Sequence, residues 1–237
     1  MSKTLVVVVR DADTLAATVA SRLVAKIVDA QAERGTASVV LTGGRIAAKV
    51  LRTVKDLPEA KAIDWSRVDL WWGDERFLPA GDPDRNETQA REALLDALSL
   101  DPARVHPMPA SDGLDGDNAE AAAARYATEV RMPFDVLMLG VGEDGHVASL
   151  FPEHPVLNET GTTAAVHNSP KPPPTRITLT MPTIQEADEV WLIAAGPDKT
   201  DAVGAALNGD KSKPAAHATG QSRTYWLLDE AAAAKRY

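Results

Sequence analysis

The feature that most constrains this fold is a short apolar run followed by a glycine-rich turn, at residues 134–154 (FDVLMLGVGEDGHVASLFPEH). The run at 134–139 is continuous and short, which is typical of a strand buried on both faces of a parallel α/β sheet. Residues that follow such a strand emerge at the carboxyl edge of the sheet, where open α/β sheets bind their ligands. We therefore expect Gly142, Asp144 and His146 to lie at a ligand-binding edge.

Asp144 and His146 stand on either side of Gly145, and a glycine permits a turn sharp enough for both side chains to face one cavity. A carboxylate beside an imidazole at a strand end favours a functional role for the histidine. Two alternatives involve no ligand. His146 would then be a capping or satisfied core histidine, and Asp144 a turn-forming residue that binds its own backbone.

The same glycines, at positions 140, 142 and 145, satisfy the G-x-G-x-x-G pattern of dinucleotide-binding turns. In that motif a strand carrying an acidic residue follows about 20 residues later. This chain has the segment TGTT at residues 160–163 there, so the pattern disfavours a dinucleotide, and we expect no cofactor.

The composition limits the partners and chemistries to consider. A formal net charge of −9 over 237 residues disfavours general binding to nucleic acid or to an anionic membrane, so a bound anion needs a local basic cluster. The chain has no cysteine, which excludes disulfides, thiolate catalysis and cysteine-ligated metals. The apolar start at residues 5–9 is shorter than a signal-peptide core or a membrane span, and we expect a cytoplasmic protein.

Strand-like runs alternate with helical patterns along the whole chain. Strands are expected at residues 5–9, 37–41, 68–72, 134–139, 177–179, 190–195 and 224–228, and a short one begins at Val105. Helices are expected from Asp11 or Asp13 to Gly35, after Gly44, from a cap at Asn86 to Leu98, at 119–130, from Gly196 to Leu207, and after a cap at Asp229. This alternation predicts one doubly wound α/β domain over residues 1–237, a Rossmann-like three-layer sandwich with a mainly parallel sheet and helices on both faces.

Two further strands end in segments that suit ligand binding. The second expected strand leads into Thr42, Gly43 and Gly44 and then a helix, an arrangement that favours an anion; the alternative is a tight turn without a ligand. The third leads into Asp74, Glu75 and Arg76. Three charges after a buried strand are costly unless they face a polar cleft or one another; the alternative is a solvated loop with a local ion pair.

These motifs together resemble the 6-phosphogluconolactonases of the glucosamine-6-phosphate isomerase/6-phosphogluconolactonase family, in order and spacing over nearly the whole chain. The resemblance rests on TGG at 42–44, WGDER at 72–76 with Pro79 and Asn86, GVGEDGHVASLFP at 140–152, Arg176, and GPDK at 196–199. Glucosamine-6-phosphate deaminases share the fold and the glycine-aspartate-glycine-histidine core, but continue with asparagine, glutamate and proline. The SLFP segment at 149–152 favours the lactonase.

One departure concerns the first glycine turn, which in the family usually continues with serine or threonine and often proline. Here Arg45 and Ile46 follow Gly44. Arg45 either reaches the phosphate as an additional cation or, as we expect for the start of a surface helix, points into solvent.

The resemblance implies hydrolysis of 6-phospho-D-glucono-1,5-lactone to 6-phosphogluconate in the oxidative pentose phosphate pathway. We expect His146 to act as the base for the attacking water and Asp144 to orient the imidazole. Ser149 lacks the G-x-S-x-G elbow of a nucleophile, and a helix-capping role is expected.

For substrate binding, the resemblance implies that Asp74 and Arg76 line the opposite wall. Arg76 would position the lactone or phosphate, while Asp74 would bind a sugar hydroxyl or hold Arg76 in place. The phosphate is assigned to the amides of Gly43 and Gly44 with Arg176 and Lys199. Gly142 completes the substrate-binding set.

The remaining histidines lack metal-ligand spacing, so no metal is expected. The expected partner is a phosphosugar lactone, and the protein is expected to be a monomer or a weak homo-oligomer. The prolines around Lys171, at positions 170 and 172–174, predict a loop of defined shape over the sheet edge. Two alternatives stay open, a deaminase-like enzyme and a non-catalytic sugar-phosphate sensor; a sensor usually has an output extension, and none is visible.

Overall fold

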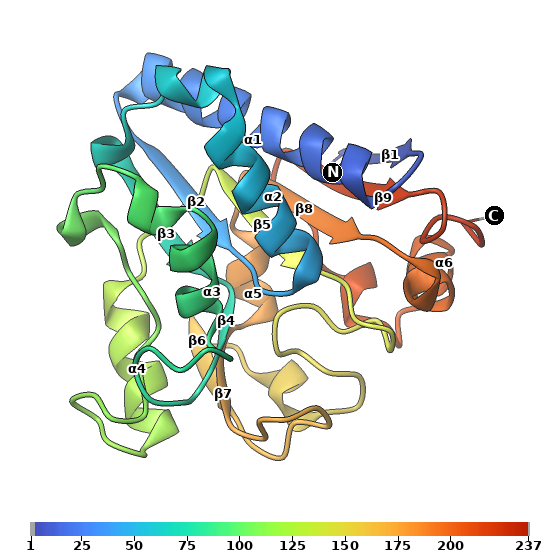
Figure 1. Ribbon diagram of the computed structural model, residues 1–237. Helices are drawn as coiled ribbons and strands as arrows, with labels where there is room; N and C mark the ends of the chain where they lie inside the picture. Colours follow the sequence, from blue (N-terminus) through green and yellow to red (C-terminus); the bar gives the residue numbers. More distant parts are fainter. Residues whose placement is uncertain (1–2, 237) are drawn as a thin grey trace.

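The computed structural model describes residues 3–236, and its centre is a six-stranded sheet in which all paired strands are parallel (Figure 1). The strand order is β1-β9-β8-β5-β2-β3. The strands are β1 Lys3–Val9, β2 Ala37–Leu41, β3 Val68–Trp72, β5 Val136–Gly140, β8 Glu189–Ala194 and β9 Arg223–Asp229.

Helices cover both faces of this sheet, as predicted. The α-helices of the chain are α1 Ala12–Arg34, α2 Arg45–Asp56, α3 Asn86–Ala93, α4 Ala119–Glu129, α5 Met181–Gln185 and α6 Thr200–Leu207. The connections from β1 to β2 to β3 run in one direction across the sheet, and those from β5 to β8 to β9 run in the other. Right-handed crossovers therefore place α1 and α2 on one face and α5 and α6 on the opposite face (Figure 1). The doubly wound α/β class is confirmed.

Helix α1 begins and ends where its sequence predicts. The Asp11 side chain accepts a hydrogen bond from the Thr14 amide at 2.8 Å, which satisfies one of the free amides of the first turn. Gly35 adopts the left-handed conformation, φ 78°, and donates its amide to the Gln31 carbonyl. The apolar stripe between these caps, which includes Leu15 and Ile27, is buried against the sheet.

A second sheet of three antiparallel strands was not predicted. Its order is β4-β7-β6, with β4 at Asp74–Arg76, β6 at Thr163–Val166 and β7 at Arg176–Leu179. Residues 177–179 form a strand as expected, but it pairs with β4 and β6 and not with the central sheet. Strand β4 consists of charged residues and has no apolar pattern, so its pairing could not be read from its own sequence.

Three local predictions are corrected by the structure. Val105 forms an isolated bridge to Leu70 and no strand. Asn86 is the first residue of α3, which ends at Ala93, and its side chain does not cap the helix. The chain after Asp229 forms turns and no helix in its described part, although the Asp229 carboxylate accepts the Ala232 amide at 2.8 Å. Strand β1 lies at the sheet edge and is only partly buried.

The direction of the crossovers reverses between the neighbouring strands β2 and β5. At this point the Thr42 hydroxyl accepts a hydrogen bond from the Gly140 amide at 3.3 Å. A Cβ atom on Gly140 would lie 3.7 Å from the Gly43 carbonyl oxygen, so the two glycine turns are in contact. Such a reversal opens a crevice at the carboxyl ends of the strands.

No helix within residues 3–236 is both long enough and apolar enough to cross a membrane.

Candidate active site

A cleft of about 710 Å³ opens at this crevice, within the size range of small-molecule sites. Its walls come from the carboxyl ends of β2, β5, β8 and β9, from β4 and β7 of the second sheet, and from the proline-rich loop around Lys171. The predicted site residues that line it are Gly43, Gly44, Asp74, Arg76, Gly142, His146, Arg176 and Lys199. The remaining predicted residue, Asp144, lies outside the lining but contacts His146.

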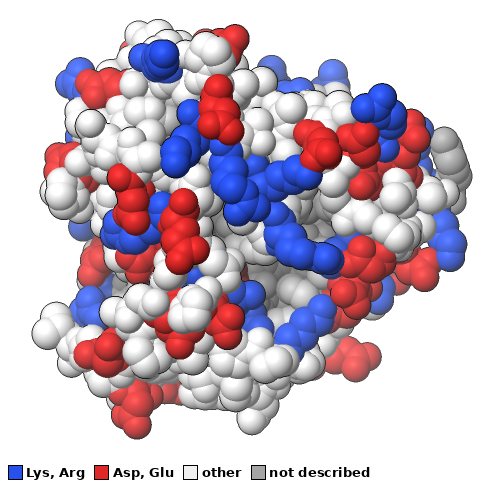
Figure 2. Space-filling model, in the orientation of Figure 1, with Lys and Arg blue, Asp and Glu red and all other residues white. Residues whose placement is uncertain are grey.

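The cleft is basic although the chain is acidic. Lysine and arginine side chains surround the hollow in Figure 2, and those that line the cleft are Arg45, Lys49, Arg76, Lys171, Arg176 and Lys199. Three carboxylates, from Asp74, Asp198 and Asp229, also line it. Because the formal net charge is −9, this local excess of positive charge marks the cleft as an anion-binding region.

The imidazole of His146 is held by Asp144. Its Nδ1 atom lies 2.5 Å from Oδ1 of Asp144, which also accepts the His146 amide at 3.2 Å. Burial alone would raise the pKa of Asp144, but the hydrogen bond and charge of His146, with a contribution from Lys171, lower that pKa well below its usual value. The Nε2 atom of His146 has no hydrogen-bond partner in the described part of the chain, so it is free to act in the cleft.

Gly142 provides the space that the imidazole occupies. A Cβ atom at this position would lie 2.0 Å from Nδ1 of His146 and 2.7 Å from Oδ1 of Asp144. Its amide donates to the His146 carbonyl at 2.9 Å and closes the turn. The amide of Gly142 is therefore already used within the protein, and the position acts by leaving room for the pair.

The opposite wall is built around the buried carboxylate of Asp74. It accepts hydrogen bonds from the Ser149 hydroxyl at 2.6 Å and from Nδ2 of Asn86 at 3.3 Å, and Nη1 of Arg176 lies 4.0 Å away. Ser149 is fully buried and caps no helix, which corrects the predicted role. Asp74 thus connects three segments: Ser149 lies after β5, Asn86 begins α3, and Arg176 begins β7.

Glu75 and Arg85 form a buried ion pair behind this wall, with 3.8 Å between Nη2 and Oε2. The Glu75 carboxylate accepts the amides of Arg76, Asn86 and Glu87 at 2.8, 2.7 and 2.9 Å. Burial raises the pKa of Glu75 to about 7, although Arg85 and the three amides oppose the shift. The charged segment after β3 is therefore not a solvated loop. Its Glu75 side chain is buried and binds backbone amides at the start of α3.

Arg76 points toward the cleft but is not held by Asp74. Its Nη1 donates to the Asp84 carbonyl at 2.6 Å, and its buried Nε has no partner among residues 3–236. The predicted alternative in which Asp74 immobilises Arg76 is wrong.

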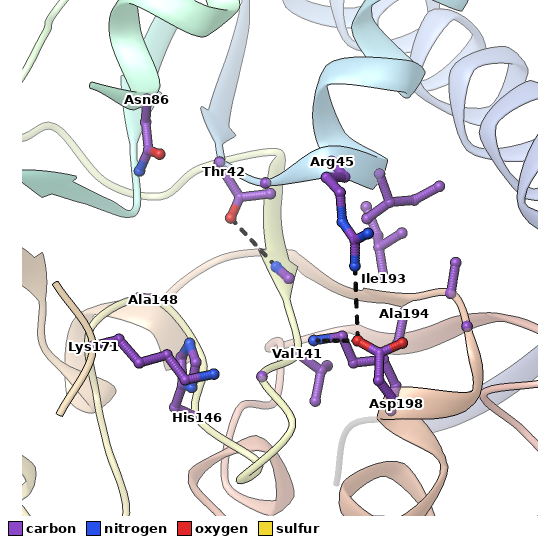
Figure 3. A pocket seen from close by; sticks show the side chains of 18 of the residues that line it. Thr42, Arg45, Asn86, Val141, His146, Ala148, Lys171, Ile193, Ala194 and Asp198 are labelled. Carbon is purple, nitrogen blue, oxygen red and sulfur yellow. Dashed lines mark hydrogen bonds and ion pairs between the residues drawn. The ribbon is translucent and has the colours of Figure 1, made fainter. Parts of the chain in front are cut away.

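The first glycine turn leaves backbone amides free at the start of a helix. Gly44 precedes α2 with φ 100° and no side chain caps the first turn, so its amides are available to an anion. Gly43 lets Asn86 approach, because a Cβ atom there would lie 1.8 Å from Oδ1 of Asn86. The Arg45 side chain is 95% exposed, as predicted, and lies 3.8 Å from Oδ2 of Asp198 at the rim of the cleft (Figure 3).

Most N–H donors of the Arg176 guanidinium group bind carbonyls of the proline-rich loop. Its Nη2 donates to the carbonyls of Lys171 and Pro172 at 3.0 Å each, and its Nε donates to that of Pro173 at 3.2 Å. Only Nη1, beside Asp74, remains for a ligand in the cleft.

Sequence reasoning missed several lining residues, namely Lys49, Asn86, Lys171, Asp198 and Asp229. Asp198 directly precedes the predicted Lys199, and that adjacency was a usable signal. Asn86 and Lys171 reach the cleft only through the pairing of β4 with β7, which no local pattern encodes. Among residues 3–236, no three His, Asp or Glu side chains are grouped so that they could hold a metal ion.

Comparisons with known proteins identify the relatives of this chain. Residues 10–226 match the family described as glucosamine-6-phosphate isomerases/6-phosphogluconolactonase. A 6-phosphogluconolactonase of Streptomyces coelicolor is 58% identical, over 97% of this chain and 93% of its own length. The 6-phosphogluconolactonase of Mycobacterium tuberculosis is 48% identical, over 95% of each chain.

Solved structures show the same fold at low sequence identity. A 6-phosphogluconolactonase from Thermotoga maritima has a TM-score of 0.85 at 24% identity, covering 96% of this chain and all of its own. A monomeric glucosamine-6-phosphate deaminase has a TM-score of 0.80 at 20% identity, covering 99% of this chain and all of its own. The fold therefore does not separate the two activities, whereas the sequence match establishes the relationship. This chain belongs to the glucosamine-6-phosphate isomerase/6-phosphogluconolactonase family.

Proposed function

We propose that this protein is a 6-phosphogluconolactonase, a carboxylic ester hydrolase that converts 6-phospho-D-glucono-1,5-lactone to 6-phospho-D-gluconate in the oxidative pentose phosphate pathway. The relatives with 58% and 48% identity carry that name over nearly their whole length. The observation that carries the chemistry is the pairing of His146 with an ionised Asp144 at 2.5 Å, beside a cleft rich in cations.

The reaction begins when Nε2 of His146 takes a proton from water and the water oxygen attacks C1 of the lactone. The carbonyl π electrons move to the carbonyl oxygen and form a tetrahedral oxyanion. When the oxyanion collapses, the bond between C1 and the ring oxygen breaks, and the imidazolium returns its proton to that oxygen. Asp144 accepts a hydrogen bond from Nδ1, fixes the tautomer and stabilises the charged ring.

The remote phosphate fits the far end of the cleft. The free amides after Gly43 and Gly44 provide hydrogen-bond donors at the positive end of α2. Lys199, whose Nζ lies 3.4 Å from Oδ2 of Asp198, and Nη1 of Arg176 add positive charge. Arg76 lines the same cleft, and we assign it to contact with the lactone.

Two other functions are distinguishable from this one. A glucosamine-6-phosphate deaminase is favoured by the shared fold, with a TM-score of 0.80, but the SLFP segment at 149–152 departs from the deaminase continuation. A non-catalytic sensor would bind the phosphosugar without turnover. The cytoplasmic location, the lack of nucleic-acid and membrane partners, and a monomeric or weakly oligomeric state stay predictions from the sequence.

The proposal is tested by measuring lactone disappearance above its spontaneous hydrolysis, together with ammonia release from glucosamine 6-phosphate. His146→Ala is expected to lower kcat by about 10²–10⁴-fold, the usual worth of general acid–base catalysis. His167→Asn is the matched control, because His167 is half-exposed and pairs with Glu120 outside the cleft. Wild-type protein that binds the lactone without accelerating its hydrolysis, or that releases ammonia, would contradict the proposal.

A further inference from the structure

The proposed hydrolysis needs a hydrogen-bond donor for the oxyanion that forms at C1. The Gly142 amide, in the turn that carries His146, already donates to the His146 carbonyl at 2.9 Å and is not available for that role. Hydrogen bonds to the oxyanion are usually the largest source of transition-state stabilisation in such a reaction. Without a donor, the transition state would lack that stabilisation. Another group on the His146 side of the cleft has to meet the oxyanion.

Lys171 is a cation on that side of the cleft. It is half-buried, lines the same cleft, and is drawn in the same region of the cleft as His146 in Figure 3. Its positive charge also contributes to the lowered pKa of Asp144. Within residues 3–236 its Nζ has no hydrogen bond or ion pair. By contrast, Lys49 pairs with Asp13 and Lys199 with Asp198.

The backbone that carries Lys171 is fixed from beneath by Arg176. Three successive carbonyls, of residues 171–173, accept hydrogen bonds from its Nε and Nη2 at 3.0–3.2 Å. Ser169 adds two contacts, since its hydroxyl donates to the Lys171 carbonyl at 2.9 Å and accepts the Lys171 amide at 3.3 Å. Arg176 is 5% exposed, so these hydrogen bonds lie inside the protein. The planar guanidinium group can donate to several loop carbonyls at once.

We propose that Lys171 is a catalytic residue whose ammonium group stabilises the oxyanion at C1, and that Arg176 is the positioning residue that holds the Lys171 backbone in place. The inference rests on the proposed lactonase function. No bond to Lys171 forms: its ammonium group donates a hydrogen bond to the carbonyl oxygen as that oxygen gains the π electrons, and keeps its own protons when C1–O re-forms its double bond.

The first test is Lys171→Met, which keeps the length of the side chain and removes its charge. Removing one oxyanion donor costs about 10²–10³-fold in kcat, and KM for the phosphorylated lactone is expected to change only a few-fold. Lys171→Arg is expected to retain part of the activity. Lys55→Met, at the exposed end of α2, is the control and is expected to match wild type.

The second test separates the role of Arg176. Arg176→Lys keeps the positive charge but cannot hold three carbonyls in a plane, so kcat at saturating substrate is expected to fall about tenfold. In the Lys171→Met background the same change is expected to alter kcat by less than twofold, because the group it positions is gone. Arg52→Lys, at an exposed position of α2, is the matched control, and thermal unfolding reports whether each variant is folded.

These outcomes are separate from the outcome for the function itself. If wild type hydrolyses the lactone and folded Lys171→Met has a kcat within a few-fold of wild type, or differs only in KM, Lys171 is not the oxyanion donor. If Arg176→Lys lowers kcat equally in both backgrounds, the effect of Arg176 on turnover does not pass through Lys171, whatever its contact with the phosphate, and the positioning role is wrong. If wild type itself does not accelerate hydrolysis, the proposed function fails first.

Discussion

The imidazole of His146 occupies the space that a side chain at position 142 would need, with only 2.0 Å between Nδ1 and a Cβ built on Gly142. Gly142 does not have a positive φ angle, so alanine is compatible with its backbone. We expect Gly142→Ala to fold but to displace the His146–Asp144 pair. The expected fall in kcat is about 10²–10⁴-fold, similar to loss of the base itself.

The control for this substitution is Gly161→Ala. A Cβ atom at Gly161 would meet its nearest atom, the Thr163 carbonyl oxygen, at 3.7 Å, an ordinary contact. Steady-state kinetics and a thermal melt of both variants provide the measurement. A Gly142→Ala enzyme with wild-type kcat would show that the observed placement of His146 is not required for turnover.

Asp144→Asn tests whether the carboxylate supports the histidine by its charge. The variant keeps an oxygen near Nδ1 but loses the negative charge, so we expect kcat to fall about 10²-fold and the acidic limb of the rate profile to move to lower pH. An unchanged profile of kcat/KM against pH would assign Asp144 to the turn alone.

The same variant has an expected effect on stability. The pKa of Asp144 is lower in the folded protein than its usual value of 3.8, so the folded state binds fewer protons than the unfolded state in acid. The ionised Asp144 carboxylate therefore stabilises the folded protein above pH 4, and this stabilisation is lost as pH falls through the pKa of Asp144 in the folded state. Because Asp144 is partly exposed, we expect about 1 kcal/mol, measured as the difference in free energy of unfolding between wild type and Asp144→Asn at pH 6. That difference should shrink toward zero in strong acid.

Ser149→Ala distinguishes a structural serine from a nucleophile. Its hydroxyl is buried and donates to Asp74 at 2.6 Å, so its loss leaves a buried carboxylate with one partner fewer. We expect a decrease of about 1–3 kcal/mol in the free energy of unfolding and a kcat within tenfold of wild type. A folded variant without activity, together with a burst of product from wild type, would indicate a covalent serine mechanism.

The elements that the sequence predicts well are those with a local signal. Continuous apolar runs gave the strands of the central sheet, and Asp11 and Gly35 marked the ends of α1 because capping depends on neighbouring residues. The site could be placed because the carboxyl ends of parallel strands share one edge. The glycine turns after β2 and β5 lie at that edge and contact each other.

The features that were missed depend on contacts between distant segments. Strand β4 exists because its charged residues pair with β7 and because Glu75 accepts amides from the start of α3. The orientation of Arg176 follows from a loop whose carbonyls lie within its reach, so its use as a clamp could not be deduced from the residue type. Arginine forks suit phosphates and carbonyls alike, and only the fold decides between them.

Lys199→Met tests the phosphate end of the cleft separately from the chemistry at His146. Lys199 lies at the start of α6, remote from the imidazole-bearing turn in sequence, and lines the cleft with Gly44. If it binds the phosphate, KM for the phosphorylated lactone should rise about tenfold, while kcat/KM for unphosphorylated gluconolactone should stay unchanged. Inorganic phosphate should inhibit wild type competitively and the variant more weakly. Only one of the two lactones carries the phosphate that the Lys199 ammonium group would bind. An equal loss of kcat/KM for both lactones would therefore mean that Lys199 supports the fold of the cleft and does not recognise phosphate.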